Sequence, residues 1–288
     1  MSVIGEAGYV LTQKELVFLA ALTGAEEMYG IEDNSFQMSD KEISEEWDKA
    51  KDQLETKKYI EVDFDNSVTM DNDLFSLIVA CCNPKVFLRT VRIEDNDCVH
   101  MRNIYITKEI AVELDRDRLS KNKYVMTPLV SIEKVAANLL ECFVTEKDYA
   151  GENLSFDIHV TDFEKLNSFV EKDETTAAID LMRNLGCNEV GAEDFIGAVK
   201  TKELCTSLLV MLIDYDNMSD VISYSYYSGC NYLWRVDVSN LGKEEEEEKI
   251  ITLSTVSSEA ALKEIEKMVL SLKHLYSSAA RKGDGVNG

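Results

Sequence analysis

The sequence contains few of the residues and motifs on which cofactor, metal or nucleophile chemistry depends. It has only 3 histidines in 288 residues, and none has a partner at the spacing of metal ligands. Phosphate-binding Gly-rich motifs and the G-x-S-x-G nucleophile motif do not occur. We therefore expect a protein that is not an enzyme, that needs no cofactor and that binds no metal.

Long apolar runs are also missing. No stretch approaches 18 uninterrupted apolar residues, and the opening "MSVIGEAGYV" has neither a positive region nor the apolar run of a signal peptide. The 7 cysteines are odd in number and form no C-x-x-C pair. Reduced, mostly buried thiols are typical of the cytosol. These features predict a cytoplasmic protein without membrane insertion.

Positive charge is scarce. The 30 lysines and arginines stand against 54 acidic residues, which gives a net charge of −24. A surface this negative repels phosphate backbones and anionic lipids and favours a partner that is basic or mainly apolar. Apolar residues make up 45% of the chain and there are only 2 prolines, so we expect a folded protein with a large core.

The stretch "SDKEISEEWDKAKDQLETKKYIEVDFDNSVTM" shows the order of a winged helix. After a helix over 12–22, it predicts a helix over 39–57 and a hairpin over 59–70. Up to residue 75 there are 18 acidic residues, 6 lysines and no arginine, whereas each phosphate contact needs a cation. We expect a winged-helix-like part that serves structure or protein binding and does not bind nucleic acid.

One apolar stripe follows the predicted helix over 39–57. Ile43, Trp47, Ala50 and Leu54 recur at intervals of three or four residues, which places them on one side of a helix. The stripe is therefore expected to face a core.

The chain contains an internal repeat with an offset of 121 residues at its start. "NDLFSLIVACC" matches "EDFIGAVKTKE", so that Asp73 corresponds to Asp194, and Asp95-Asn96 falls on Asp216-Asn217. From these matched segments onward, a helix, three strands, a loop, a fourth strand and a second helix recur in the same order. The second copy is longer within its run of glutamates, as expected for an insertion in a surface loop.

The repeat predicts an α+β fold. It is internally duplicated, with antiparallel β-meander sheets, flanking helices and the winged-helix-like N-terminal part, and its halves are 1–145 and 146–288. The strands are expected at 85–94, 98–106, 110–116 and 123–127, and at 207–214, 220–228, 232–238 and 249–254. The closing helices are expected at about 130–144 and 256–275.

The opening segment "YVLTQKELVFLAALTG", together with this duplicated arrangement over nearly the whole chain, resembles the EspG family of type VII (ESX) secretion. The resemblance implies a cytosolic chaperone or adaptor. Such proteins bind helical-hairpin secretion substrates, cover the apolar tip of the hairpin and keep it soluble for export. The implied partner is a small helical secretion substrate, and the resemblance transfers no binding residues.

Two other functions fit the residues. An acidic immunity protein that neutralises a secreted toxin would have a similar net charge, although the size and duplication fit it less well. A winged-helix regulator fits the order of elements in 39–70 but not their charge. The oligomeric state stays open.

Aromatic residues gather on one predicted hairpin, in "YSYYSGCNYLW". The corresponding first-half segment has one aromatic residue, Tyr105, and aromatic side chains commonly anchor interfaces. The competing interpretation is that these rings hold the sheet to its helices. The predicted partner-binding residues are Ile222, Tyr224, Tyr226, Tyr232 and Trp234.

An acidic loop is the second predicted feature of the site. It comprises Glu244, Glu245, Glu246, Glu247 and Glu248. A run of this kind is usually solvated, and it could also steer a basic partner.

Overall fold

The protein forms two compact units, each with its own core. Unit 1 comprises 1–87, 102–135 and 272–288, and unit 2 comprises 88–101 and 136–271. The computed structural model describes residues 8–32, 38–94, 98–117, 120, 122–143, 145, 147–150, 154–201, 204–214, 217–239 and 249–275. Within this part of the chain, no helix is both long and apolar enough to cross a membrane.

Three helices of unit 1 begin at well-formed caps. They are α1 (Gln13–Leu22), α2 (Asp40–Thr56) and α3 (Asn72–Cys82). The hydroxyls of Thr12 and Ser39 accept from the backbone N–H three residues on, and the carboxylates of Glu15 and Glu42 accept from the cap N–H in return. Asp71 caps α3 through the N–H of Leu74. These local signals explain why the predicted helices begin where they do.

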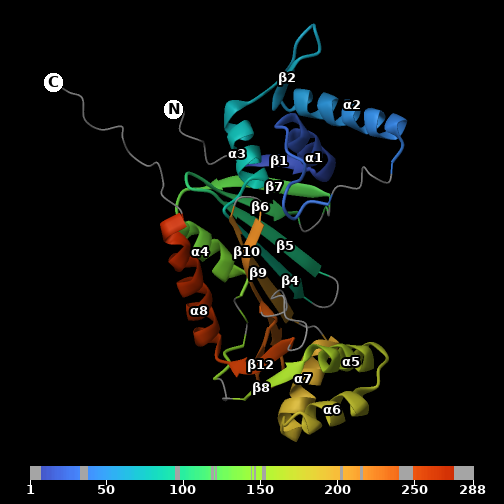
Figure 1. Ribbon diagram of the computed structural model, residues 1–288, viewed down its shortest axis with the longest axis vertical. Coiled ribbons are helices and arrows are strands. Elements are labelled where there is room, and N and C mark those ends of the chain that lie inside the picture. Colours follow the sequence, from blue (N-terminus) through green and yellow to red (C-terminus); the bar gives the residue numbers. More distant parts are fainter. Residues whose placement is uncertain are drawn as a thin grey trace, which may run out of the picture. The chain divides into compact units, whose positions relative to one another are not determined.

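The strands of unit 1 form one antiparallel array and one separate hairpin. The array has the order β1–β7–β6–β5, in which β5 contributes its second half, and the hairpin joins β2 to β3. Their bounds are Tyr9–Thr12 for β1, Ile60–Val62 for β2, Val68–Met70 for β3, Cys98–Ile106 for β5, Ala111–Arg116 for β6 and Lys123–Leu129 for β7. Figure 1 shows the β2–β3 hairpin beyond the C-terminal end of α2.

Unit 2 contains the longer strands, in the order β4–β9–β10–β11–β12–β8. Their bounds are Val86–Glu94 for β4, Ser155–His159 for β8, Leu204–Asp214 for β9, Asn217–Ser228 for β10, Leu233–Asp237 for β11 and Ile250–Val256 for β12. Helices α5 (Val160–Glu171), α6 (Thr175–Asn184) and α7 (Glu189–Thr201) pack on one side of β11 and β12 around Phe195 and Trp234. Helix α8 (Ser258–Ser271) follows β12, and the 3-10 helix that comes next, Leu272–Leu275, belongs to unit 1.

The prediction of an α+β fold with a large antiparallel sheet flanked by helices is confirmed. The order α3–β4–β5–β6–β7–α4, where α4 spans Ile132–Glu141, recurs as α7–β9–β10–β11–β12–α8. The sequence had not predicted β1 and β8, which pair antiparallel with β7 and β12, the last strand of each meander. Superposition of the two copies, the boundary between 145 and 146 and the likeness to a winged helix stay predictions.

Candidate partner-binding surfaces

The five aromatic and apolar residues predicted to bind a partner lie on two opposite faces of the β10–β11 hairpin. In the register of this pair, Tyr226 is opposite Arg235, and Tyr227 is opposite Trp234. Because successive strand residues point to opposite faces, Tyr226 and Arg235 share one face while Trp234 lies on the other. Ring contacts agree with this assignment: Tyr226 lies 6.4 Å from Tyr224, and Trp234 lies 5.1 Å from Phe195 of α7.

The five predicted binding residues also differ in how much of each side chain is exposed to solvent. Trp234 is 0% exposed, Tyr226 is 4% exposed and Tyr232 is 9% exposed, so these three belong to the core. Ile222 and Tyr224 are partly buried and keep some accessible surface. In this conformation a partner can touch only Ile222 and Tyr224 among the five.

A buried carboxylate holds the tip of this hairpin. Asp194 on α7 accepts hydrogen bonds from the backbone N–H of Asn231 at 2.7 Å and of Tyr232 at 3.3 Å. It also accepts from the side-chain amide of Asn231 at 3.1 Å and from the indole Nε1 of Trp234 at 3.0 Å. Four donors therefore satisfy one carboxylate, and none of them is a cation.

The turn between β10 and β11 is fitted closely to Asp194. A Cβ placed on Gly229 would overlap with Oδ2 of Asp194, so only glycine allows this approach. The phenol of Tyr149 donates to the carbonyl of Gly229 at 2.8 Å, and Lys147 donates to the carbonyl of Cys230. The hairpin tip is thus held from several sides, which makes it a rigid support for the exposed part of β10.

The face that carries Tyr224 also carries an ion pair with α8. Arg235 Nη1 donates to both carboxylate oxygens of Glu264, at 2.8 and 2.6 Å, and the guanidinium carbon lies 5.5 Å from the centre of the Tyr224 ring. Burial, with help from the nearby Asp237 and Glu264, raises the pKa of Tyr224. The phenol therefore stays neutral near pH 7 and offers a donor beside an aromatic surface.

The buried hydroxyl of Tyr226 has no hydrogen-bond partner among the described residues. Burial raises the pKa of this phenol further above its ordinary value. The ring packs edge-on against Phe143, with centroids 5.5 Å apart. Tyr226 therefore contributes packing behind Tyr224, and its hydroxyl lowers stability unless a further group reaches it.

Unit 1 contains a half-open cleft between α1 and α2, with a volume of about 390 Å³. Its apolar lining comes from Val17, Met38, Ile43, Trp47 and Ala50. Ala50 and, one turn on, Leu54 are buried as the sequence predicts, whereas Trp47 is 40% exposed. The expectation that the whole stripe faces a core is therefore wrong at Trp47, whose ring packs edge-on against Phe18 beside the cleft.

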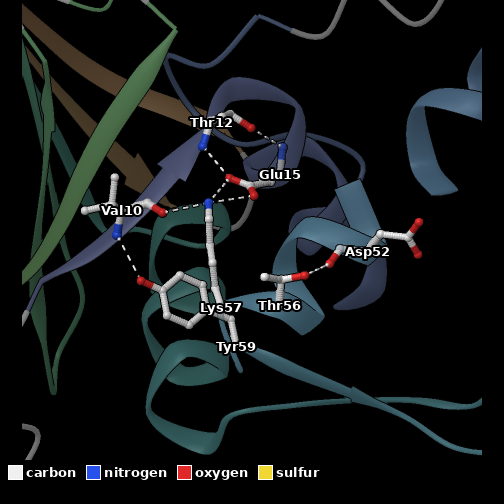
Figure 2. A network of polar contacts seen from close by, with 7 residues as sticks. All are labelled: Val10, Thr12, Glu15, Asp52, Thr56, Lys57 and Tyr59. Atoms are coloured by element: carbon white, nitrogen blue, oxygen red, sulfur yellow. Dashed lines mark hydrogen bonds and ion pairs between the residues drawn. The ribbon is translucent and has the colours of Figure 1, made fainter. Parts of the chain in front are cut away.

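A second buried carboxylate lies at the start of α1 (Figure 2). Glu15 is 0% exposed, and Lys57 Nζ donates to both its carboxylate oxygens at 2.7 Å. Oε2 of Glu15 also accepts from the N–H of Thr12 at 2.6 Å. Because this carboxylate binds a cation and the N–H of a helix cap, it has a structural role and is a poor candidate for acid–base chemistry.

Strand β1 lies at one end of the sheet order, so one of its edges has no neighbouring strand among the described residues. Side chains cover this outer edge at Val10. The N–H of Val10 donates to the hydroxyl of Tyr59 at 3.3 Å, and Lys57 Nζ donates to the Val10 carbonyl at 3.1 Å. Figure 2 shows both contacts beside the Glu15 pair. Lys57 therefore joins a helix cap to a strand edge.

The described part of the chain contains no group of three or more His, Cys, Asp or Glu side chains that could hold a metal ion. Among its cysteines no disulfide forms; Cys81, Cys82, Cys142, Cys187 and Cys205 are buried, and Cys230 is exposed. Burial raises the pKa of Cys82 and of Cys187 to about 11, which keeps both as unreactive thiols near pH 7. The predicted acidic loop, Glu244–Glu248, lies outside the described residues.

Sequence reasoning assigned no role to Asp194 and did not find the cleft beside Trp47. The signal for Asp194 was available: it lies between Ala192 and Phe195 on the apolar side of a helix, where a charged residue needs partners. No comparable signal marks the cleft, because its walls come from two helices that are separated along the chain.

No family model matches this chain, and no curated protein matches it. Among solved structures, it is similar to the type VII secretion system chaperone EspG5 of Mycobacterium tuberculosis, determined in complex with the PE25–PPE41 dimer. The TM-score is 0.61 at 9% sequence identity, and the match covers 96% of this chain and 99% of that chain. At this identity the match shows a shared fold.

Proposed function

We propose that the protein is a chaperone or adaptor of a type VII secretion system, which binds a helical-hairpin substrate in the cytosol and keeps it soluble for export. The observation that carries this proposal is the similarity in fold to EspG5 over nearly the full length of both chains. A match to a fragment could reflect a common building block. A match over 96% and 99% of the two chains covers the whole fold and not only one part of it.

The proposed contact surface is the exposed part of β10, at Ile222 and Tyr224. Tyr226 supports it from behind, and the tip of the hairpin is held by Tyr232, Trp234 and Asp194. An apolar and aromatic surface on a rigid hairpin suits a substrate whose exposed apolar tip would otherwise aggregate. The net charge of −24 keeps such a complex soluble, and the run Glu244–Glu248 would attract a basic partner.

The test is co-expression with a helical-hairpin secretion substrate encoded in the same genome. The substrate alone is expected in the insoluble fraction; with this protein it is expected in the soluble fraction, in a stoichiometric complex on size-exclusion chromatography with light scattering. A substrate that stays insoluble contradicts the proposal. Recovery of a secreted toxin instead, with loss of its toxicity, would support the immunity function.

The location of the site has its own test. Ile222→Ala combined with Tyr224→Ala should lower affinity for the substrate by about thirtyfold, since truncating an interface aromatic costs on the order of 2 kcal/mol. The melting temperature should stay unchanged. Val190→Ala on α7 is the matched control, because Val190 is exposed and lies outside this surface. An unchanged affinity in the double variant would move the site elsewhere and leave the chaperone function intact.

A further inference from the structure

The apolar stripe of α2 is covered along only half of its length by the described residues. Ala50 and Leu54 are buried, whereas Trp47 is 40% exposed, Ile43 is partly buried and Met38, just before the helix, is 37% exposed. The open half forms one wall of the cleft of about 390 Å³, and Val17 of α1 lies on the opposite wall. A Trp side chain left open beside a cavity is a typical anchor point for a partner side chain.

The shape of this cleft favours a helical occupant. Ile43 and Trp47 are one helical turn apart and form a ridge along α2, and ridges of this spacing pack into the grooves of another helix. Apolar side chains at i, i+3, i+4 and i+7 of such a helix would meet this ridge, as in other helix-in-groove complexes. The cavity volume leaves room for a large aliphatic or aromatic side chain against Trp47.

The charged side chains that line the cleft balance one another, with Lys14 and Lys49 against Glu32 and Glu46. The rest of α2 carries six more acidic residues, all exposed, and two more lysines, so these exposed carboxylates favour a basic occupant. Lys14 and Lys49 both bind Glu46 at the rim, and these contacts, Lys14 first, lower the pKa of Glu46 and keep it ionised. Other pairs on α2, such as Lys41–Glu45 at 3.6 Å, are exposed and therefore weak, so a partner's lysines can compete for their carboxylates.

We propose that the α1–α2 cleft binds a basic amphipathic helix, which inserts an apolar side chain against Trp47 and lays its lysines or arginines along the acidic side of α2. This inference goes beyond the chaperone function. It concerns unit 1 and applies to any protein that presents such a helix, whether or not that protein is secreted.

The test uses a synthetic peptide and the full-length protein. The probe is a fluorescent 18-residue helix with leucine at i, i+3, i+4 and i+7 positions and lysine elsewhere, titrated by fluorescence anisotropy. Two control peptides keep the length: one replaces leucine by serine at the same charge, and the other replaces lysine by glutamate. The leucine–lysine helix should bind saturably, and both controls should bind at least tenfold more weakly.

Variants locate the binding. Trp47→Ala should weaken binding by about thirtyfold, and Met38→Ser at the mouth of the cleft by about fivefold, in line with the cost of truncating a central and a peripheral interface residue. Phe75→Ala is the matched control, because Phe75 on α3 is 46% exposed but does not line the cleft. Met38→Ser serves as the second test if Trp47→Ala lowers the stability of the fold.

Trp47 also gives a direct signal. The other tryptophan, Trp234, is 0% exposed, so any protection from acrylamide quenching on peptide binding reports on Trp47. Protection together with the loss of affinity in the cleft variants supports the proposal. Equal losses in Trp47→Ala and Phe75→Ala, or binding of the serine peptide as tight as that of the leucine peptide, would overturn it, since the attraction would then be only a diffuse effect of net charge.

Discussion

Glu15 in unit 1 and Asp194 in unit 2 are both buried carboxylates on helices, but their partners differ in kind. Glu15 is neutralised by a cation, Lys57, which binds both of its oxygens. Asp194 binds four N–H donors and no lysine or arginine among the described residues. The first arrangement balances charge, and the second replaces the hydration shell with fixed dipoles. Stability should therefore depend mainly on charge balance at Glu15 and mainly on the hydrogen-bond acceptor at Asp194.

The largest effect is expected from Asp194→Ala. It leaves the buried N–H groups of Tyr232 and Trp234 without an acceptor, so the free energy of unfolding should fall by about 4 kcal/mol. Urea titration measures this change, and Glu193→Ala is the control, since Glu193 is exposed on the same helix. Thiol labelling should show that Cys187, which lies in the same core as Trp234, becomes reactive while Cys81 stays protected. Equal stability of the two variants would contradict the role of Asp194.

Lys57→Met should cost about 3 kcal/mol of stability, because it leaves the buried Glu15 without its cation. Adding Glu15→Gln should recover part of this loss, since the remaining group is then neutral. Lys41→Met, at an exposed pair on α2, should change stability by less than about 0.5 kcal/mol. Asp194→Asn is expected to be little more stable than Asp194→Ala, because the NH2 group of the new amide would face the N–H donors of Tyr232 and Trp234. If stability is recovered to the same extent at both sites, the charge of the buried carboxylate would determine stability at both, and the proposed difference between them would be wrong.

Variants of the two tryptophans, one in each unit, test the same comparison with smaller expected changes in stability. Trp234→Phe removes the indole donor of Asp194 from a fully buried site and should lower stability by about 2 kcal/mol. Trp47→Phe keeps a ring against Phe18 at the open cleft and should cost less than about 1 kcal/mol. Thermal unfolding of the two variants under one buffer compares them directly. A larger loss for Trp47→Phe would mean that the cleft is more important for the fold than its exposure indicates.

The smallest effect is expected at Tyr226. Because its buried hydroxyl has no partner among the described residues, Tyr226→Phe should keep stability or raise it by up to about 1 kcal/mol. Tyr149→Phe is the contrasting variant, since the Tyr149 hydroxyl donates to Gly229 and its loss should lower the melting temperature. A clear loss in Tyr226→Phe would reveal a partner for the hydroxyl, such as a bound water.

The order of helices and strands could be predicted because its signals are local. Thr12 and Ser39 mark helix starts with capping boxes, and the alternation in β10 places Ile222, Tyr224 and Tyr226 on one face. The strands β1 and β8 could not be found, since each is short and pairs with a strand far away in sequence. Their neighbours β7 and β12 were predicted because the internal repeat matches the two segments to each other.

The candidate sites were less predictable, because exposure depends on what packs from elsewhere. The sequence grouped Tyr232 and Trp234 with Tyr224, but the register of β10 against β11 turns Trp234 toward α7. Nothing in the spacing of Ile43 and Trp47 distinguishes them from Ala50 and Leu54. The difference lies in their surroundings: Ala50 and Leu54 are buried, whereas Trp47, although it packs against Phe18, stays 40% exposed beside the cleft.

The covered edge of β1 has a consequence for how this protein can be stored and used at high concentration. An open sheet edge recruits strands from other chains, which leads to domain swapping or fibres. Here the outward N–H and carbonyl of Val10 are already bonded to Tyr59 and Lys57, so an incoming strand would have to displace two side chains before it gained a hydrogen bond. Strand addition at Val10 is therefore disfavoured, which lowers the tendency of this edge to start domain swapping or fibres in a concentrated stock of the protein.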